Sequence, residues 1–179
     1  FIGILKLLKK SNHVRNITND KNPFVTIVLS ARNEEGSIGQ CLESLINQTY
    51  PSSCYEIIPV NDASEDQTME IINDYMLKND RVKPINIKPG KRQIQGKINA
   101  IDKGILYAKG EIIITTDADT WMGTEWISKM VGSFDNSIGF VLGITLDQIS
   151  NNPVHAFQAL DGIGILVIAA ALADMHNPI

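Results

Sequence analysis

The stretch Glu111-Ile112-Ile113-Ile114-Thr115-Thr116-Asp117-Ala118-Asp119 joins an apolar, β-branched run to a pair of acidic residues. The run begins after Gly110 and predicts a buried strand, because β-branched residues pack well in sheets. Asp117 and Asp119 follow at its carboxyl end, which is where open α/β sheets bind their ligands. Carboxylates suit Mg²⁺ or Mn²⁺, and such an ion can hold a diphosphate. The pair alone is weak evidence, because helix caps and turns use the same residues.

Strand and helix patterns alternate through the rest of the chain. Further strands are predicted over residues 25–29, 55–60, 82–88 and 138–146. Helices are predicted over residues 37–49, 64–77, 98–108 and 124–134, and from 152 onward. Pro84 places the strand over 82–88 near a sheet edge, since proline cannot donate to a ladder. Repeated strand–helix units with short connections indicate an α/β fold, with a mostly parallel central sheet covered by helices on both faces.

For two of these helices the sequence also predicts which side chains face inward, and for one of them how it begins. Ser64-Glu65-Asp66-Gln67 has the pattern of a capping box at the start of a helix. The apolar spacing in that helix predicts three inward-facing residues, Met69, Ile72 and Met76. The same spacing in the next helix predicts an inward face formed by Ile98, Ile101, Ile105 and Ala108.

Composition and charge exclude several classes of protein. The chain has 179 residues, a formal net charge of −4 and ordinary apolar and charged fractions, as expected for one domain with a sizeable core. It has no basic patch interleaved with aromatic residues, so nucleic acid is not expected as a partner. Its two cysteines, Cys41 and Cys54, are too few for a disulfide framework and are expected to be reduced and structural.

The two ends of the sequence indicate a piece of a longer protein, because it starts at Phe1 rather than Met and stops at Asn177-Pro178-Ile179 without a closing element. Residues 1–10 are apolar and then basic. They match either the cytoplasmic end of a membrane-spanning helix or a short amphipathic helix, and the sequence does not decide between these two. Residues 162–173 are apolar but too few to span a bilayer, so a buried or interfacial helix is expected there.

Polar residues follow three of the predicted parallel strands, within residues 30–35, 61–64 and 117–119. Because the carboxyl ends of parallel strands meet at one edge of a sheet, we expect these segments to lie close together. The helix start at Gly96-Lys97 can reach the same edge. Its free backbone N–H groups and the Lys97 ammonium favour a phosphate there.

Four ordered motifs resemble those of the family 2 glycosyltransferases: Ala31-Arg32-Asn33-Glu34-Glu35, Val60-Asn61-Asp62-Ala63-Ser64, Gly96-Lys97-Ile98-Asn99-Ala100 and Thr115-Thr116-Asp117-Ala118-Asp119. The resemblance implies the GT-A fold, a Rossmann-like α/β/α sandwich, and inverting transfer of a sugar from a nucleotide-diphosphate sugar to an acceptor hydroxyl. It assigns residues 23–179 to the donor-binding portion of a GT-A domain that is incomplete at its C-terminal end. It leaves residues 1–22 as a membrane-proximal or amphipathic segment, which would tether the protein at the cytoplasmic face of a membrane.

The resemblance also assigns the side chains that contact the nucleoside of the donor. Asp62 matches the carboxylate that hydrogen-bonds the base or its ribose. Arg32 and Glu34 lie in the loop that contacts the base. Many members have Pro and Tyr where this chain has Ser30 and Arg32, and an Arg guanidinium can also stack on a base.

Three further residues match the diphosphate side of the donor site. Lys97 would neutralise donor charge, and Asp117 would contact the ribose or a metal-bound water. Asp119 would ligate the Mn²⁺ or Mg²⁺ that bridges both phosphates. Trp121, just after the acidic pair, is a candidate for the wall of a sugar or acceptor pocket.

The family's general base is a carboxylate well downstream of the acidic pair, and no matching segment is found here, so the base is expected beyond Ile179. Asp147, Asp161 and Asp174 do not match it and are expected at the surface or at helix ends. The acceptor, a glycan, a lipid or a polysaccharide precursor, is therefore not specified. A non-catalytic sugar-nucleotide-binding module of the same fold stays open as an alternative.

Of two other phosphate-handling classes, the sequence excludes a P-loop NTPase and disfavours a phospho-acceptor signalling domain. Residues 90–98 imitate a Walker A loop but have one residue too many between the glycines, and Ile98 where Ser or Thr must hold Mg²⁺. A phospho-acceptor signalling domain needs an acidic pair after its first strand, where this chain has Arg32-Asn33-Glu34-Glu35.

Overall fold

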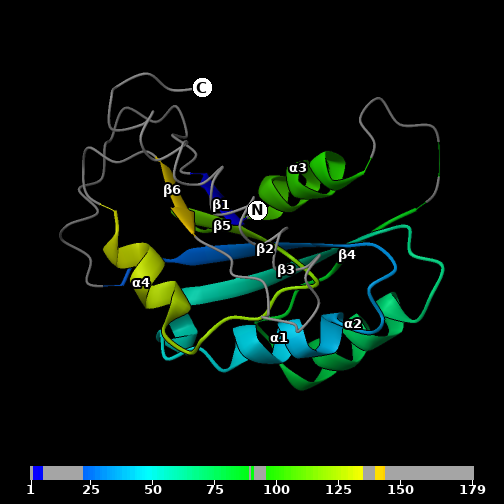
Figure 1. Cartoon of the computed structure of the whole chain (residues 1–179), viewed down its shortest axis with the longest axis horizontal. Helices are drawn as coiled ribbons and strands as arrows, with labels where there is room; N and C mark the ends of the chain where they lie inside the picture. The colour runs from blue at the N-terminus through cyan, green and yellow to red at the C-terminus, as the bar shows by residue number, and fades with distance from the viewer. Residues whose placement is uncertain (1, 6–21, 89, 91–95, 135–139, 144–179) are drawn as a thin grey trace, which may run out of the picture. The chain divides into compact units, whose positions relative to one another are not determined.

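The computed structural model describes residues 2–5, 22–88, 90, 96–134 and 140–143. Its strands form one sheet in the order β4-β3-β2-β5-β1-β6 (Figure 1). The strands are β1 (Ile2–Leu5), β2 (Val25–Ala31), β3 (Tyr55–Asp62), β4 (Ile85–Ile87), β5 (Ile112–Asp117) and β6 (Phe140–Gly143). β2, β3, β4 and β5 are parallel, whereas β1 runs antiparallel to both its neighbours, β5 and β6. The predicted α/β class with a mostly parallel sheet is confirmed.

Helices cover both faces of this sheet. The helices are α1 (Ile38–Ile46), α2 (Thr68–Lys78), α3 (Lys97–Tyr107), α4 (Trp126–Gly132) and a short 3₁₀ helix, η2 (Ser52–Cys54). Figure 1 shows α3 above the sheet and α1 and α2 below it. The core is divided in the same way, because α1, α2 and α4 contribute buried residues to one apolar cluster and α3 to another. The molecule therefore has the three-layer α/β/α arrangement.

The central strands are apolar on both faces because helices cover both. In β2, Ile27 and Leu29 belong to the cluster between the sheet and α1, whereas Val28 belongs to the cluster between the sheet and α3. In β5, Ile114 and Ile113 divide in the same manner. This explains why the sequence has continuous apolar runs here rather than alternation of apolar and polar residues.

Helix α3 lies unusually close to β2. A Cβ atom added to Gly104 would be only 2.3 Å from Cγ1 of Val28, so a larger residue would push the helix away from the sheet. The neighbouring buried residue one turn earlier is Ala100. These small residues fix the position of α3 and hence of Lys97 in its first turn.

Several detailed expectations are wrong. Ser64 does not cap α2, whose N-terminal cap is Gln67 without a side-chain hydrogen bond. Met76 is 39% exposed and Ile98 is 69% exposed, although both were expected to face inward. The reason is that other residues of these helices are buried in their place, among them the polar Thr68 in α2 and the small Ala100 in α3.

The N-terminal segment also differs from expectation where the structure describes it. Ile2–Leu5 form strand β1 between β5 and β6, and not part of a helix. In the described parts of the chain, no helix combines the length and the apolar character needed to cross a bilayer. The rest of that segment, the helix expected from residue 152 and the aspartates at 147, 161 and 174 lie outside the described residues.

A buried carboxylate joins the amino-terminal ends of the strands. The Glu56 side chain is 1% exposed, and Lys83 Nζ lies 2.8 Å from its Oε2. Its Oε1 accepts hydrogen bonds from Thr26 Oγ1 at 2.9 Å and from the Lys109 backbone N–H at 3.0 Å. Although burial disfavours the charged form, the hydrogen bonds from Lys83, Lys109 and Thr26 lower the pKa of Glu56 below its ordinary value.

We expect Glu56→Gln to lower the free energy of unfolding at pH 7 by about 1.5–3 kcal/mol, the usual value of hydrogen bonds to a charged group. Because the pKa is lower in the folded state, this stabilisation is complete above the ordinary glutamate pKa of about 4.3 and is lost as the pH falls through the folded-state value. Urea unfolding at pH 7 and pH 3 measures the difference, which should shrink at pH 3. Glu125→Gln is the control, because Glu125 and Lys129 form an exposed pair at 3.1 Å, and it should cost below about 0.5 kcal/mol. Equal losses in the two variants would contradict the prediction.

Candidate functional site

The carboxyl ends of β2, β3 and β5 and the first turn of α3 enclose a cleft of about 240 Å³. The parallel register explains why these ends meet: Ser30 of β2 lies opposite Val60 of β3 and opposite Asp117 of β5. The structure brings all the residues predicted for the donor site to this one cleft, namely Ser30, Arg32, Glu34, Asp62, Lys97, Asp117 and Asp119. Their individual roles remain predictions.

A tight turn presents the acidic pair. Thr120 Oγ1 donates to the Asp117 backbone oxygen at 2.8 Å and lies 2.9 Å from Thr116 Oγ1. Ala118 is buried, whereas Asp119 is exposed at the tip of the turn. The two carboxylates therefore belong to the same cleft while the alanine between them anchors the turn in the core.

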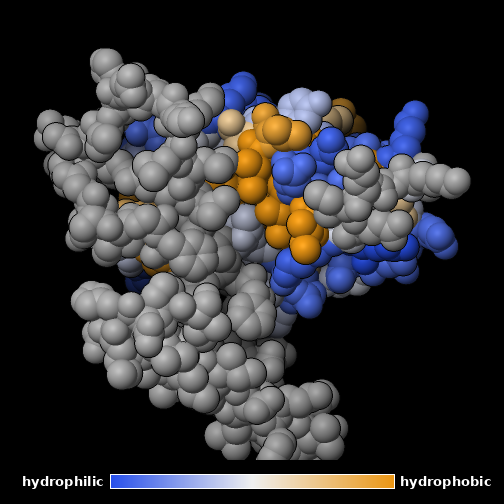
Figure 2. Space-filling model, turned by 90° about the horizontal axis from the view of Figure 1, so that it is seen from above, coloured by the Kyte–Doolittle hydropathy of each residue, from blue (hydrophilic) through white to orange (hydrophobic). Residues whose placement is uncertain are grey.

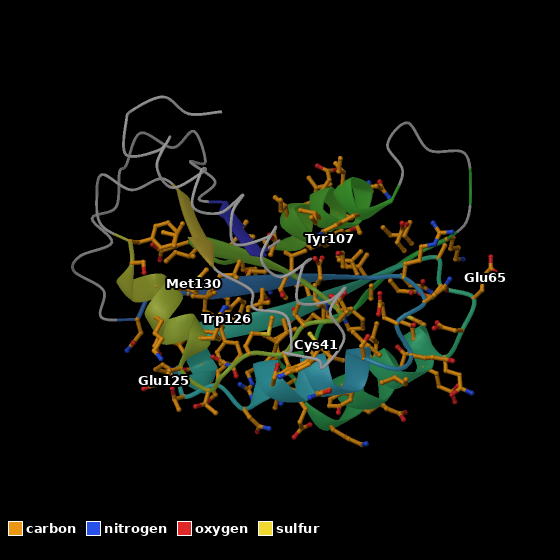
Figure 3. The ribbon with its side chains drawn as sticks, in the orientation of Figure 1. Cys41, Glu65, Tyr107, Glu125, Trp126 and Met130 are labelled. Carbon is orange, nitrogen blue, oxygen red and sulfur yellow. The ribbon has the colours of Figure 1, made fainter. Side chains whose placement is uncertain are left out.

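Cys41 of α1 supports this turn from below. Its Sγ donates to the Asp117 backbone oxygen at 3.6 Å, and Figure 3 shows the side chain between α1 and the sheet. Burial, together with the charges of Asp119, Asp117 and Glu34, raises the pKa of Cys41 to about 12. The thiol is therefore protonated at neutral pH. Both cysteines are free, as predicted.

An ion pair crosses the cleft from α3 to β5. Lys97 Nζ lies 2.6 Å and 2.7 Å from the two carboxylate oxygens of Asp117. The Lys97 side chain is 47% exposed and that of Asp117 is 25% exposed, so the pair contributes little to stability. The pair matters for the charge of the cleft, because the Lys97 ammonium neutralises the Asp117 carboxylate where several acidic side chains lie together.

Acidic side chains outnumber basic ones among the described residues that line the cleft. Glu34, Asp62, Asp117 and Asp119 face it together with Arg32 and Lys97. A diphosphate would meet net negative charge here, so its binding requires an added cation or rearranged basic side chains.

The residues present fit a divalent ion that also binds a ligand. Within the described parts of the chain, no group of three or more His, Cys, Asp or Glu is arranged to hold a metal. Asp117 and Asp119 would thus supply at most two protein ligands. Mg²⁺ is commonly bound in this way, through one or two carboxylates together with substrate phosphates and water.

Two loops that shape the cleft are held together by backbone-to-side-chain hydrogen bonds. The Asn33 N–H donates to Ser64 Oγ at 3.0 Å, and the Glu65 N–H donates to Asn33 Oδ1 at 2.9 Å. Asn33 and Ala63 both have φ of 55°, a left-handed conformation that asparagine tolerates better than most residues. We call the hydrogen bonds between residues 33–35 and 64–68 the loop clasp.

The loop clasp continues toward α2. The Glu34 N–H donates to Thr68 Oγ1 at 2.7 Å, and Thr68 is fully buried. The Glu35 N–H donates to Asp66 Oδ2 at 3.1 Å, while Glu35 Oε2 accepts from the Gln67 N–H at 3.0 Å. Residues that resembled a local capping box therefore connect two loops, and this fixes the backbone that follows Arg32 and Asp62.

Sequence reasoning missed the cleft residues that have small side chains. Ala31, Ala100 and Ala118 line the cleft alongside the predicted residues, as does Gly96. Gly96 has φ of 73°, which only glycine adopts without strain. Trp121 does not line this cleft but a second one on α1.

A family model and two relatives in the comparisons with known proteins all describe glycosyltransferases or a polysaccharide synthase. The chain matches the family model described as glycosyl transferase family 2 over residues 26–158. It is 38% identical over 145 residues to the probable glycosyltransferase YdaM of Bacillus subtilis, covering 81% of this chain and 32% of that protein. It is 32% identical over 178 residues to the poly-beta-1,6-N-acetyl-D-glucosamine synthase of Staphylococcus epidermidis, covering 97% of this chain and 40% of that protein.

Two solved structures are similar as well. TarS 1–349 of S. aureus in complex with UDP-GlcNAc superimposes with a TM-score of 0.54 at 25% identity, over 61% of this chain and 30% of that one. The mannosyltransferase PcManGT from Pyrobaculum calidifontis in complex with GDP-Man and Mn²⁺ gives a TM-score of 0.50 at 28% identity, over 64% and 32%. These matches show the expected GT-A fold. The chain spans only about a third of the length of such relatives.

The loop clasp can be tested through Thr68. We expect Thr68→Val to lower the free energy of unfolding by about 1–3 kcal/mol, because the partly buried Glu34 N–H loses its acceptor. Denaturant unfolding measures this, and the amide NMR shifts of residues 33–35 should move. Thr124→Val is the matched control at an exposed position and should stay within about 0.5 kcal/mol of the parent. An unchanged stability in Thr68→Val would mean that the clasp is not a constraint.

Proposed function

This chain belongs to glycosyltransferase family 2, and from that premise we propose that it serves inverting transfer of a sugar from a nucleotide-diphosphate sugar to an acceptor hydroxyl. One observation carries the proposal: the side chains that the family resemblance assigns to the donor line a single cleft at the sheet edge. Such an edge is where open α/β sheets bind nucleotides. The complexes of TarS with UDP-GlcNAc and of PcManGT with GDP-Man support a nucleotide-sugar donor.

The nucleoside is assigned to the β2 and β3 side of the cleft. Asp62 is 3% exposed at the end of β3, so its carboxylate is held in place to accept hydrogen bonds from a base or a ribose. Arg32 is exposed in the adjacent loop, where its planar guanidinium can stack on the base. Glu34 lies on the same side, fixed by the loop clasp.

The diphosphate is assigned to the α3 and β5 side. Lys97, now paired with Asp117, turns toward the phosphate oxygens when the donor binds, and the free N–H groups of the α3 N-terminus face the same anion. Asp117 is assigned to contact the ribose or a metal-bound water, and Asp119 to ligate the metal. A bound Mn²⁺ or Mg²⁺ supplies Lewis-acid stabilisation of the charge on the departing diphosphate.

The remaining parts of the proposal concern the whole protein. The acceptor is a glycan, a lipid or a polysaccharide precursor, and its hydroxyl is deprotonated by a general base that lies beyond Ile179. The protein acts at the cytoplasmic face of a membrane. Titrating a panel of UDP-, GDP- and dTDP-sugars with and without Mn²⁺ tests the central claim, and binding of none of them would overturn it.

The metal assignment predicts the behaviour of Asp119→Asn. Wild-type chain should bind its nucleotide-sugar more tightly when Mn²⁺ is added, and the variant should lose at least tenfold of that gain, because Asp119 supplies a ligand oxygen. Isothermal titration calorimetry with and without Mn²⁺ measures the effect. Asp102→Asn, at an exposed position on α3, is the control and should behave like the wild type. The same Mn²⁺ dependence in Asp119→Asn would refute the assignment.

The ion pair predicts two opposite effects of Lys97→Met. Without nucleotide, Mn²⁺ should bind the variant roughly fivefold more tightly, because Asp117 no longer has an ammonium to displace. Without metal, the nucleotide-sugar should bind roughly fivefold more weakly, because the positive charge facing the diphosphate is gone. Lys103→Met, also exposed on α3, should change neither value. If both affinities moved in the same direction, the exchange of partners by Lys97 would be wrong.

A further inference from the structure

A second cleft lies on the outer face of α1. It is an open depression of about 420 Å³ and is lined by Gln40 and Glu43 of α1, by Asn47 at the C-terminal cap of α1, by Tyr75 of α2 and by Trp121 from the turn after β5. Gln40, Glu43 and Asn47 follow one another at helical spacing, so they form a polar floor. The two aromatic side chains come from different elements on either side of that helix. We call this cleft the α1 groove.

Trp121 is unusual because a large aromatic residue is left in water. Its side chain is 49% exposed, whereas Trp126, only five positions later, packs against the core. Figure 3 shows Trp126 on the core-facing side of α4. The exposure of Trp121 therefore does not follow from a lack of core positions in this part of the chain. An exposed tryptophan in a concave site is typical of ligand binding.

The backbone that follows Trp121 is bonded to α1 and to the residues just after α1. The Met122 N–H donates to Ser44 Oγ at 3.1 Å, and Gln48 Nε2 donates to the Gly123 oxygen at 2.8 Å. The Thr49 N–H donates to the Thr124 oxygen at 2.8 Å. Because the backbone on its C-terminal side is bound to α1, the tryptophan is placed beside the polar floor before any ligand arrives.

The polar floor is also organised. Glu43 Oε1 accepts a hydrogen bond from Asn47 Nδ2 at 2.9 Å, and the Tyr75 side chain lines the same cleft. Gln40 and Glu43 are both exposed. Carboxylate and amide groups fixed in this way can accept and donate hydrogen bonds to several hydroxyl groups at once.

We propose that the α1 groove binds an uncharged oligosaccharide, namely a segment of the acceptor glycan, with a sugar ring stacked on Trp121 and its hydroxyls bonded to Gln40, Glu43 and Asn47. The inference rests on the proposed glycosyl transfer and specifies the acceptor class. A pyranose has an apolar C–H face and a polar hydroxyl edge, which matches an aromatic wall beside a polar floor. Protein interfaces, in contrast, have few charged residues at their centre.

The charge of the α1 groove and its distance from the first cleft further restrict the class of ligand. Among the described lining residues the charged one is Glu43, whose negative charge repels anionic polymers and is compatible with an uncharged glycan. Trp121 is two residues after Asp119, so their Cα atoms lie at most roughly 7 Å apart. A glycan that ends at the donor cleft can therefore reach the α1 groove with its next sugar units.

The test is a ligand-observed NMR titration of the full chain with cellotetraose and N-acetylated chitotetraose, both uncharged, and with trigalacturonate as the anionic probe. At least one neutral tetrasaccharide should bind saturably, and trigalacturonate should not. Trp121→Ala should weaken binding at least tenfold, whereas Trp121→Phe should stay within about threefold, because it keeps a ring for stacking. Tyr107→Ala is the matched control. Tyr107 is a 66% exposed aromatic on α3, on the opposite face of the sheet from α1, so its loss should have no effect (Figure 3).

Titration of the same samples with a nucleotide-sugar separates this inference from the proposed function. Donor binding without tetrasaccharide binding, or equal affinity in Trp121→Ala and wild type, would overturn the α1 groove and leave the function intact. Tetrasaccharide binding that depends on Trp121, without binding of any nucleotide-sugar, would support the groove and remove the function. Binding of trigalacturonate, or of a mixed peptide digest in place of glycans, would show a different occupant and overturn the inference.

Discussion

The parallel register of β2 between β3 and β5 is the constraint on which the site depends. Ser30 lies opposite Asp117 on one side, and Ala31 lies opposite Asn61 on the other. The chain therefore leaves the sheet after β2, β3 and β5 at the same level. A shift of one residue would turn the buried apolar side chains of β2 toward the wrong layer. Because both faces of this strand are packed against helices, the core opposes such a shift strongly. The positions of the acidic groups are thus fixed by the burial of isoleucine, leucine and valine.

Electrostatics then determine what the cleft can hold. Carboxylates from three elements face one another, and Lys97 already neutralises Asp117. The cleft is therefore unfavourable for a bare diphosphate and favourable for a diphosphate accompanied by a cation. The hydrophobic surface near this cleft lies on α3, where Ile98 and Leu106 are exposed, and Figure 2 shows apolar side chains gathered on that side.

The sequence predicted the features that depend on strong, repeated local signals. The Ile112–Ile114 run identified β5, and the acidic residues marked the sheet edge because they follow directly after that strand and not because the pair is specific by itself. Ser64 and Asp66 gave a wrong result because their side chains bond to a loop more than thirty residues away, which local patterns do not reveal. Ile98 was misplaced because Gly104 brings α3 so close to the sheet that small residues face inward. The four residues of β1 were too few to show a strand period.

One turn connects the two clefts physically. Asp119 faces the donor cleft and Trp121 faces the α1 groove, while the residues between and after them are bonded to Asp117 and to α1. The turn has only one residue between the two side chains, so a shift of its backbone would move both. Helix α1 takes part on both sides, since Cys41 supports the Asp117 backbone and Ser44 supports Met122. Helix α1 thus contacts the backbone behind both clefts, at Asp117 through Cys41 and at Met122 through Ser44.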